Sequence, residues 1–328
     1  MFNLITIGDI VIDTHVKIDD ASIECDLSHI SCKLCLNYAA KIPITDSFQS
    51  LGGNAANVAV GASKLGLKTA ILSSIGKDSN GKTILQELKK LKINTGFVTE
   101  YANAKTRYAV ILNFKSERTI LSFHQKRNYV MPKKMPDSNW IYYTSLSEGF
   151  ENLQNKLVEF LNNHSTSRLA FNPGSFQIKN NLKKVKEILQ KTDLLFVNLE
   201  EAEKISGTIL KKEKTEASLI KKLLATGAKE IVITDAERGA WAGNKEKIWH
   251  LDGYQVKVIA KTGAGDSFSA GYLSARFYGR DISEALKWGM ANSSSVIGQV
   301  GAQKGLLNKN GIKKMTEKFS AIKPIELV

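Results

Sequence analysis

The chain has 328 residues, 43% hydrophobic and 24% charged, which is the balance of a globular protein with a full apolar core. A membrane partner is excluded on composition, because no apolar run approaches the roughly 20 residues needed to span a bilayer. The net charge of +14 comes from lysine pairs spread along the chain, a distribution that favours solvated helix faces over a nucleic-acid footprint. The N-terminus has no signal-peptide pattern, so we expect a cytoplasmic protein.

Short apolar runs alternate with amphipathic segments of helical period along most of the chain. The apolar runs predict β-strands over residues 3–9, 68–76, 139–145, 167–174, 193–199 and 229–235. The amphipathic segments predict helices over residues 55–66, 81–91, 151–163, 181–190 and 216–227, and another helix is predicted over 266–279. Near-continuous apolar strands between such helices are typical of a sheet covered on both faces. The fold class is therefore α/β, a doubly wound, mainly parallel sheet with helices on both faces.

Two regions interrupt this alternation. Residues 14–50 show no helical pattern, and residues 106–124 (TRYAVILNFKSERTILSFH) predict a hairpin that turns near Lys115 and Ser116. We expect segments of approximately 14–50 and 100–128 to form a small β-sheet lid at the strand ends where open α/β sheets bind ligands. All of residues 1–328 then form a single domain. Because exposed sheet edges pair with other strands, a homodimer through the lid is a further expectation.

Three cysteines and a histidine lie close together in the first of these regions, at Cys25, His29, Cys32 and Cys35. Three thiols and an imidazole suit a tetrahedral zinc site, and Cys32 and Cys35 have the C-x-x-C spacing of zinc ligands. An odd number of cysteines argues against a disulfide framework. Between a zinc site and reduced thiols in a small sheet, we favour reduced thiols.

A first glycine-rich turn, GKDSNGKT at residues 76–83, matches the P-loop pattern G-x-x-x-x-G-K-[ST]. It follows a predicted strand and precedes a predicted helix. Asp78 weakens the P-loop interpretation, because it places a carboxylate inside a loop that would have to hold anions. The alternative is a plain strand-to-helix turn, which we favour.

A second glycine-rich turn, KTGAGDSFSAGYL, lies at residues 261–273. Gly263, Ala264 and Gly265 are small enough for the backbone to close around an anion, and the helix that follows presents free N–H groups and the positive end of its dipole. Asp266 stands at the helix start. An anion hole beside a carboxylate suits phosphoryl transfer, in which N–H groups stabilise the moving phosphoryl group and the carboxylate accepts the acceptor's proton. The alternative is an ordinary N-cap aspartate with glycines for tight packing.

The stretch TGAGDSFSAG resembles the C-terminal signature of the ribokinase-like carbohydrate and nucleoside kinases, the PfkB family. LGGNAANVAVGASKLG at residues 51–66 resembles that family's N-terminal glycine signature, and IGKDSNGKTILQELKKLKINT has its G-x-D-x-x-G pattern. The resemblance covers nearly the whole chain. It implies a ribokinase-like fold, ATP as phosphoryl donor, Mg²⁺ as cofactor and a small-molecule sugar or nucleoside as acceptor. The P-loop match is then accidental.

The resemblance also implies roles for individual residues. Asp266 matches the catalytic base, and the anion hole is matched by Gly263, Ala264 and Gly265. The acceptor-binding positions are matched by Asp13, at the end of the first strand, and by Gly52, Gly53 and Asn57. The nucleotide-binding positions are matched by Asn198, Thr234, Gly239, Asn292 and, in the VGAQKG loop, Gly301. Glu201, in an N-x-x-E motif, matches the residue that helps to hold Mg²⁺ through water.

The chain departs from the family pattern at three positions. The family often has D-T-x-G-A-G-D, whereas the first two positions here are Ala260 and Lys261. The missing carboxylate is associated with a monovalent-cation site, so potassium activation is in doubt, and Lys261 is a candidate to supply the positive charge instead. Ala236 replaces the usual glycine of the nucleotide loop.

The sequence thus predicts an ATP-dependent sugar kinase, a phosphotransferase with an alcohol group as acceptor. A nucleoside kinase of the adenosine type is the alternative. Four aromatic residues of the lid region are candidates to stack on a base, at Tyr108, Phe114, Phe123 and Tyr129, although packing within the lid is the interpretation that we favour for them. Basic residues of the same region are candidates to bind an acidic or phosphorylated sugar: His124, Lys126 and Arg127. The acceptor itself stays open.

Overall fold

The computed structural model describes residues 1–26, 32–115, 117–123, 125–164, 166–210 and 215–327. Its large sheet contains β1 (Phe2–Ile7), β6 (Thr69–Gly76), β7 (Asn94–Tyr101), β10 (Ser138–Tyr143), β11 (Arg168–Phe171), β12 (Leu194–Asn198), β13 (Glu230–Thr234), β14 (Ala240–Gly243), β15 (Ile248–Leu251) and β16 (Ile325–Leu327). The spatial order is β16-β15-β14-β13-β12-β11-β10-β1-β6-β7. Strands β7 to β13 in this order pair in parallel, and β14, β15 and β16 add an antiparallel edge.

Helices cover both faces of this sheet, as expected for apolar strands such as β6, in which every residue is buried. One face packs against α3 (Phe150–Asn163), α5 (Leu182–Leu189), α6 (Leu199–Ser206) and α7 (Glu216–Leu224). The other packs against α8 (Ala264–Phe277), α9 (Ile282–Ile297) and α10 (Lys309–Lys318). Three further helices are α1 (Asn54–Lys64), α2 (Ser79–Lys90) and α4 (Ser175–Asn180), with a 3₁₀ turn, η1 (Ala236–Arg238). The predicted doubly wound α/β class is confirmed.

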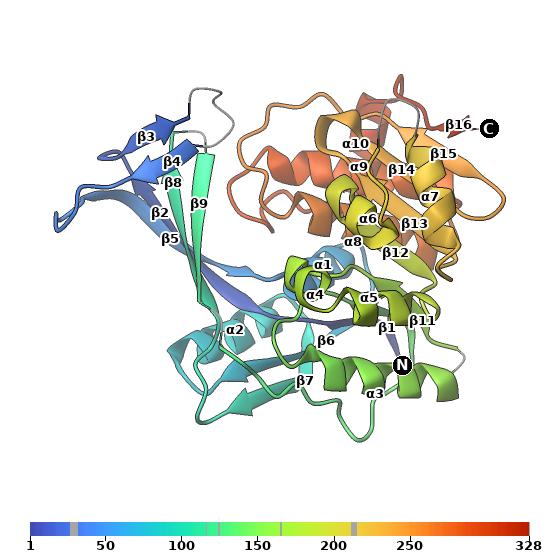
Figure 1. Cartoon of the computed structure of the whole chain (residues 1–328), viewed down its shortest axis with the longest axis horizontal. Helices are drawn as coiled ribbons and strands as arrows, with labels where there is room; N and C mark the ends of the chain where they lie inside the picture. The colour runs from blue at the N-terminus through green and yellow to red at the C-terminus, as the bar shows by residue number, and fades with distance from the viewer. Residues whose placement is uncertain (27–31, 116, 124, 165, 211–214, 328) are drawn as a thin grey trace.

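A separate small sheet stands beside the large one, at the left of Figure 1. It consists of β2 (Val11–Ile18), β5 (Ile44–Gly52), β8 (Tyr108–Phe114) and β9 (Glu117–Phe123), in the order β5-β2-β8-β9. β8 and β9 form the hairpin predicted over 106–124. A two-stranded hairpin, β3 (Ser22–Cys25) and β4 (Cys32–Cys35), precedes β5, and residues 14–50 contain no helix where they are described.

The position of Asp13 differs from the prediction. β1 ends at Ile7, and Asp13 lies in β2, where it pairs with Ser50 of β5 and Ala109 of β8. The apolar run through residue 9 extends past the large sheet, and the chain crosses into the small sheet before Val11. Asp13 is therefore carried by the small sheet, on the opposite face of β2 from the buried apolar residues Val16 and Ile18.

The cysteine prediction was wrong for two of the three residues. Cys25 and Cys32 pair across the β3–β4 hairpin and are joined by a disulfide, while Cys35 is a free, partly exposed thiol. A pair of sulfurs bonded to each other cannot act as two zinc ligands. His29 lies outside the described residues, and no cluster of metal-binding side chains is found within the described ranges.

The helices within the described ranges are too short or too polar to cross a bilayer.

Candidate active site

A cavity of about 430 Å³ lies between the small sheet and the carboxyl ends of the parallel strands. The small sheet contributes Asp13 of β2 and Arg118 of β9, and the large sheet contributes Asn198 and Thr234 at the ends of β12 and β13. The turn before α8 forms another wall of the cavity. Because open α/β sheets bind ligands at the carboxyl ends of their strands, this cavity is where a ligand is expected.

The second glycine-rich turn places the N-terminus of α8 at the cavity. Gly263 is the N-cap of the helix, with φ of 77°, and a Cβ there would lie 2.5 Å from Cβ of Ala302. Only glycine fits this left-handed, crowded position. A Cβ on Gly265 would meet no atom within 4 Å, so the space above that residue is open. The first-turn N–H groups, which have no partner within a helix, therefore lie beside open space that suits an anion.

Asp266 is the third residue of α8, not its N-cap, and no side chain caps this helix. The ordinary N-cap interpretation is therefore wrong. Oδ2 of Asp266 instead accepts a 2.8 Å hydrogen bond from Nδ2 of Asn57 in α1. Burial raises the pKa of Asp266 to about 6, and the hydrogen bond from Asn57 opposes that rise. A buried carboxyl group with a pKa close to neutrality suits a general base.

Asn57 is itself held in place. Nε2 of Gln303 donates to Oδ1 of Asn57 at 3.0 Å and also to the carbonyl oxygen of Leu51 at 3.0 Å. With Oδ1 occupied as an acceptor, the amide nitrogen of Asn57 points at Asp266. Gln303 belongs to the VGAQKG loop, in which the resemblance matches Gly301 to a nucleotide-binding position.

Asp13 lies against the predicted glycine pair. A Cβ on Gly52 would lie 2.2 Å from Oδ2 of Asp13, and Gly53, with φ of 94°, is the N-cap of α1. The carboxylate of Asp13 therefore packs directly on the backbone of Gly52, and the left-handed backbone of Gly53 requires glycine. Burial, and next the charge of Asp266, raise the pKa of Asp13 to about 6. The two carboxylates thus line one cavity and are close enough to influence each other's ionisation.

Asn198 and Glu201 form a capping box at the start of α6. Oδ1 of Asn198 accepts from the backbone N–H of Glu201 at 2.9 Å, and Oε2 of Glu201 accepts from the backbone N–H of Asn198 at 3.0 Å. Burial raises the pKa of Glu201. Glu201 lines the cavity, and carboxylate oxygens of this kind suit Mg²⁺ that keeps several waters.

Comparison with known proteins identifies the family of this chain. Residues 15–309 match the model of the pfkB family of carbohydrate kinases. The chain belongs to this family. The predicted enzyme class, a phosphotransferase that acts on an alcohol group, is confirmed with it.

Individual relatives of this pfkB-family kinase act on different acceptors. The chain is 26% identical to an ATP-dependent 6-phosphofructokinase of Thermoanaerobacterium thermosaccharolyticum, over 80% of this chain and 84% of the relative. It is 28% identical to a nucleoside kinase of Methanocaldococcus jannaschii, over 84% of this chain and 89% of the relative. A structure of Arabidopsis thaliana ribokinase complexed with ribose and ATP matches the fold with a TM-score of 0.77, at 18% identity, covering 96% of this chain and 98% of the other.

Most of the predicted site residues of the kinase line this cavity, and four do not. Gly52 lies against Asp13 but is not part of the cavity wall. Gly239, with φ of 89°, and Gly301, with φ of 99°, lie in turns outside its wall. Asn292 is fully buried. Its Nδ2 donates to the carbonyl oxygen of Ser267 at 2.7 Å, and its Oδ1 accepts from the backbone N–H of Leu307 at 2.9 Å, so it ties α9 to α8 behind the cavity.

Sequence reasoning missed several residues of the cavity wall. Arg118 and Ser122 come from β9, and Asn172 follows β11. The β9 residues belonged to the predicted hairpin, and their period-2 spacing from each other was the available signal. Asn172 has no such signal, because only the strand order places it beside β12, where its Nδ2 donates to the carbonyl oxygen of Phe196 at 2.9 Å. Two of the basic residues proposed for an acidic sugar do not line the cavity: Lys126 pairs with Glu148 at 2.7 Å, and Arg127 donates to the carbonyl oxygen of Lys105. The third, His124, is outside the described residues.

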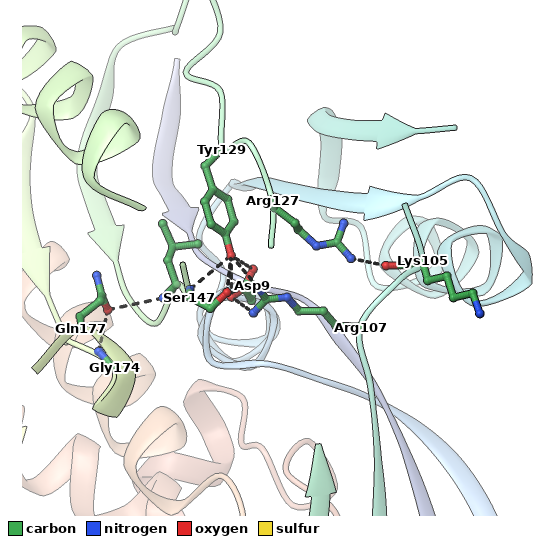
Figure 2. A network of polar contacts seen from close by, with 9 residues as sticks. Asp9, Lys105, Arg107, Arg127, Tyr129, Ser147, Gly174 and Gln177 are labelled. Atoms are coloured by element: carbon green, nitrogen blue, oxygen red, sulfur yellow. Dashed lines mark hydrogen bonds and ion pairs between the residues drawn. The ribbon is translucent and has the colours of Figure 1, made fainter. Parts of the chain in front are cut away.

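A buried polar cluster at the base of the small sheet was also missed (Figure 2). Asp9 follows β1, and Arg107 immediately precedes β8, so the two residues mark the two places where the chain enters the small sheet. The guanidinium of Arg107 pairs with Asp9 and donates to Tyr129 Oη at 2.8 Å, and Tyr129 Oη donates to Asp9 Oδ1 at 2.9 Å. Arg107 also donates to Ser147. This cluster fixes the small sheet to the large one.

The turn at residues 76–83 is closed by its own contacts. A Cβ on Gly81 would lie 2.1 Å from the carbonyl oxygen of Gly76, so the two ends of the turn are in contact. Asp78 fills the turn: it caps α2 by accepting from the Gly81 N–H at 2.9 Å and accepts from Thr106 Oγ1 at 2.6 Å. The preferred strand-to-helix interpretation is consistent with this geometry, and Asp78 additionally holds the chain entering β8.

Proposed function

We propose that this kinase transfers the γ-phosphoryl group of ATP to a hydroxyl group of a sugar or sugar-like acceptor, with Mg²⁺. Asp266 accepts the hydroxyl proton, the acceptor oxygen forms the new bond to phosphorus, and the bond from phosphorus to the β–γ bridging oxygen breaks to release ADP. The N–H groups of Gly263, Ala264 and Gly265 stabilise negative charge on the moving phosphoryl group. The observation that carries the proposal is a buried carboxylate beside an uncapped helix N-terminus in the cavity that also contains Asp13.

The acceptor side is assigned to the small sheet and α1. Asp13 accepts hydrogen bonds from neighbouring hydroxyl groups of the acceptor, with the backbone at Gly52 and Gly53 directly behind it. Asn57 keeps the carboxylate of Asp266 turned toward the acceptor hydroxyl, because its own amide is fixed by Gln303. Closing of residues 14–50 and 100–128 as a lid would exclude water, the competing acceptor.

The nucleotide side is assigned to the strand ends beyond α8. Asn198 and Thr234 contact the phosphates, while Gly239 and Gly301 shape the loops around the nucleotide, and Asn292 acts indirectly by holding α8. Mg²⁺ neutralises phosphate charge when bound, and Glu201 would hold it through water. Lys261, which lines the cavity, supplies the positive charge that a monovalent cation gives elsewhere, so potassium should leave the rate unchanged.

A nucleoside acceptor is the second candidate, favoured by the 28% identity to the Methanocaldococcus jannaschii nucleoside kinase. Cytoplasmic location and a homodimer through the small sheet remain proposals from the sequence.

The function is tested by measuring acceptor-dependent ADP release with ribose, fructose, fructose 6-phosphate, ketodeoxygluconate and adenosine. We expect at least one to stimulate turnover that Asp266→Asn removes. Turnover that no acceptor stimulates, or that survives this substitution, would refute the proposal.

A further inference from the structure

A second cavity of about 410 Å³ adjoins the acceptor side of the first. Arg118 of β9 lines both cavities. The second cavity is enclosed by the small sheet on one side and on the other by Ile259, Ala260, Val300 and Lys304, which belong to loops beside α8 and α9. The space around an acceptor bound at Asp13 therefore continues past Arg118 into the second cavity.

The register of the small sheet gives the distance from Asp13 to the residues that line the second cavity. Asp13, His15 and Lys17 alternate along β2 and share one face, since residues two apart in a strand point the same way. The rise of a strand places His15 about 7 Å from Asp13 along β2. Arg118 pairs with Asn113, which in turn pairs with Lys17, so Arg118 and Lys17 lie in one cross-strand row. A substituent roughly one sugar ring away from Asp13 reaches His15. The row of Lys17 lies about 13 Å from Asp13 along β2, and from that row the side chain of Arg118 lines both cavities.

The second cavity carries an excess of positive charge. Four cationic side chains line it against two carboxylates: Lys17, Lys115, Arg118 and Lys304 against Asp46 and Glu117. Among the described residues, none of these four cations has a carboxylate oxygen within 4.0 Å. Unpaired cations around a concave site attract an anion.

Two polar atoms in this wall also lack a partner. Nε of Arg118 and Nδ1 of His15 are buried and make no hydrogen bond within the described part of the chain. His15 is held in position by stacking on Phe48, with ring centroids 4.4 Å apart, and by contact of its Nε2 with Ser50 Oγ at 3.3 Å. Lys304 approaches the same Phe48 ring, with Nζ 5.7 Å from the centroid. Because buried polar atoms are nearly always satisfied, these two atoms are available to bind a ligand oxygen.

We propose that the acceptor carries an anionic group, a phosphate or a carboxylate, that binds among His15, Arg118 and Lys304 while the reacting hydroxyl lies at Asp13 and Asp266. This inference rests on the proposed function and specifies its substrate class. The guanidinium of Arg118 donates to the anion in the wall between the two cavities. Lys304 supplies charge from the opposite side.

The test compares matched acceptors that differ in one anionic group. We would measure kcat/KM for ADP release with fructose and fructose 6-phosphate, ribose and ribose 5-phosphate, and glucose and gluconate. We expect the anionic member of at least one pair to be better by about 10- to 100-fold, the range of a charge-assisted hydrogen bond. The phosphate pairs and the gluconate pair separate a phosphate ester from a carboxylate, and either result supports the proposal.

Arg118→Gln keeps a hydrogen-bonding side chain and removes the charge. It should lower the ratio of anionic to neutral kcat/KM by about 10-fold or more, because general damage to the enzyme cancels in that ratio. Lys304→Gln is the second variant: Lys304 is exposed, so this change does not threaten folding, and it should move the ratio in the same direction. Lys126→Gln, in the exposed pair with Glu148, is the matched control and should leave the ratio unchanged.

The outcomes separate this inference from the function on which it rests. Equal use of neutral and anionic acceptors, with turnover still dependent on Asp266, would overturn the anion site and leave the kinase proposal standing. A preference for adenosine over all anionic acceptors would do the same. A ratio of anionic to neutral kcat/KM that neither Arg118→Gln nor Lys304→Gln changes would also overturn the anion site. Absence of acceptor-dependent ADP release with every compound would overturn both the anion site and the kinase proposal.

Discussion

Replacing Asp266 with asparagine should remove activity and at the same time stabilise the fold. The side chain is only 9% exposed, and burial raises its pKa from 3.8 to about 6. At about 1.4 kcal/mol per pKa unit, the ionised carboxylate destabilises the folded state by roughly 3 kcal/mol at pH 8. Asparagine has the same shape and no charge, and its amide oxygen can still accept from Asn57. The variant should therefore gain up to about 3 kcal/mol at pH 8, which is roughly 5 °C in Tm.

Because the pKa of Asp266 is raised in the folded chain, the stability gained by Asp266→Asn depends on pH. Below about pH 4 the carboxyl group is protonated in both the folded and the unfolded chain, so the wild type carries no penalty and the variant has no advantage. Between about pH 4 and 6 the unfolded chain ionises first, and the stability of the wild type falls relative to the variant. Above about pH 6 the difference is constant. Activity changes the opposite way: kcat/KM should fall as the pH drops through about 6, because the base is then protonated.

The assay combines ADP release with thermal melts from pH 4.5 to 8. We expect kcat of Asp266→Asn to fall by about 10²- to 10⁴-fold. Asp137→Asn, at a side chain that is 57% exposed, is the control and should change neither kcat nor stability by more than about 0.5 kcal/mol. Near-normal kcat in Asp266→Asn would remove the catalytic role. A lower Tm at pH 8 would show instead that the carboxylate is a structural group.

Three further predictions concern other parts of the molecule. Glu201→Ala and Glu201→Gln should both raise the Mg²⁺ concentration for half-maximal rate, by about 10- to 100-fold, and an unchanged Mg²⁺ titration in both would remove Glu201 from the metal. Lys82→Ala should leave kcat and the KM for ATP unchanged, since Lys82 is exposed on α2 outside the cavity, whereas a P-loop lysine would be essential. Arg107→Ala should lower the free energy of unfolding in urea by about 3–5 kcal/mol, because Asp9 would be left buried and unpaired. Asp9→Asn in the same chain should restore part of that loss, and no recovery in the double variant would contradict the ion-pair argument.

The elements that could be predicted from the sequence are those whose own residues determine them. The strand at residues 68–76 is apolar throughout because both of its faces are buried, and its pattern suffices to identify β6. The same holds for the turn at Gly263, where the left-handed backbone and the close approach of Ala302 require glycine. In both cases the residues of the segment itself determine its local structure, so the segment can be recognised without knowledge of its partners.

The residues that escaped prediction depend on partners far along the chain. Arg107 has no local pattern: its role arises because residues 9, 107 and 129 meet where the chain crosses between the sheets. Gln303 orients Asn57 from 246 residues away. The disulfide of Cys25 and Cys32 depends on the register of a hairpin whose turn the sequence did not specify. In each case the role of the residue depends on a partner that only the folded chain brings next to it, and the local sequence does not show that partner.

The two glycine-rich turns show which physical feature separates an anion site from a structural helix start. Both present a helix N-terminus with an aspartate, and both match a phosphate-binding pattern in letters. In α2 the carboxylate of Asp78 accepts from the Gly81 N–H in the first turn of its own helix, and so occupies a donor that an anion would use. In α8 the carboxylate of Asp266 turns away and accepts from Asn57 of another helix, so the first-turn donors and the positive dipole end stay available. The place of the aspartate in the helix, at the N-cap of α2 and at the third residue of α8, therefore decides whether its carboxylate occupies a first-turn donor. Substituting Asn57 with leucine, which removes the partner that holds Asp266 away from its own helix, should accordingly reduce kcat more than it raises the KM for ATP.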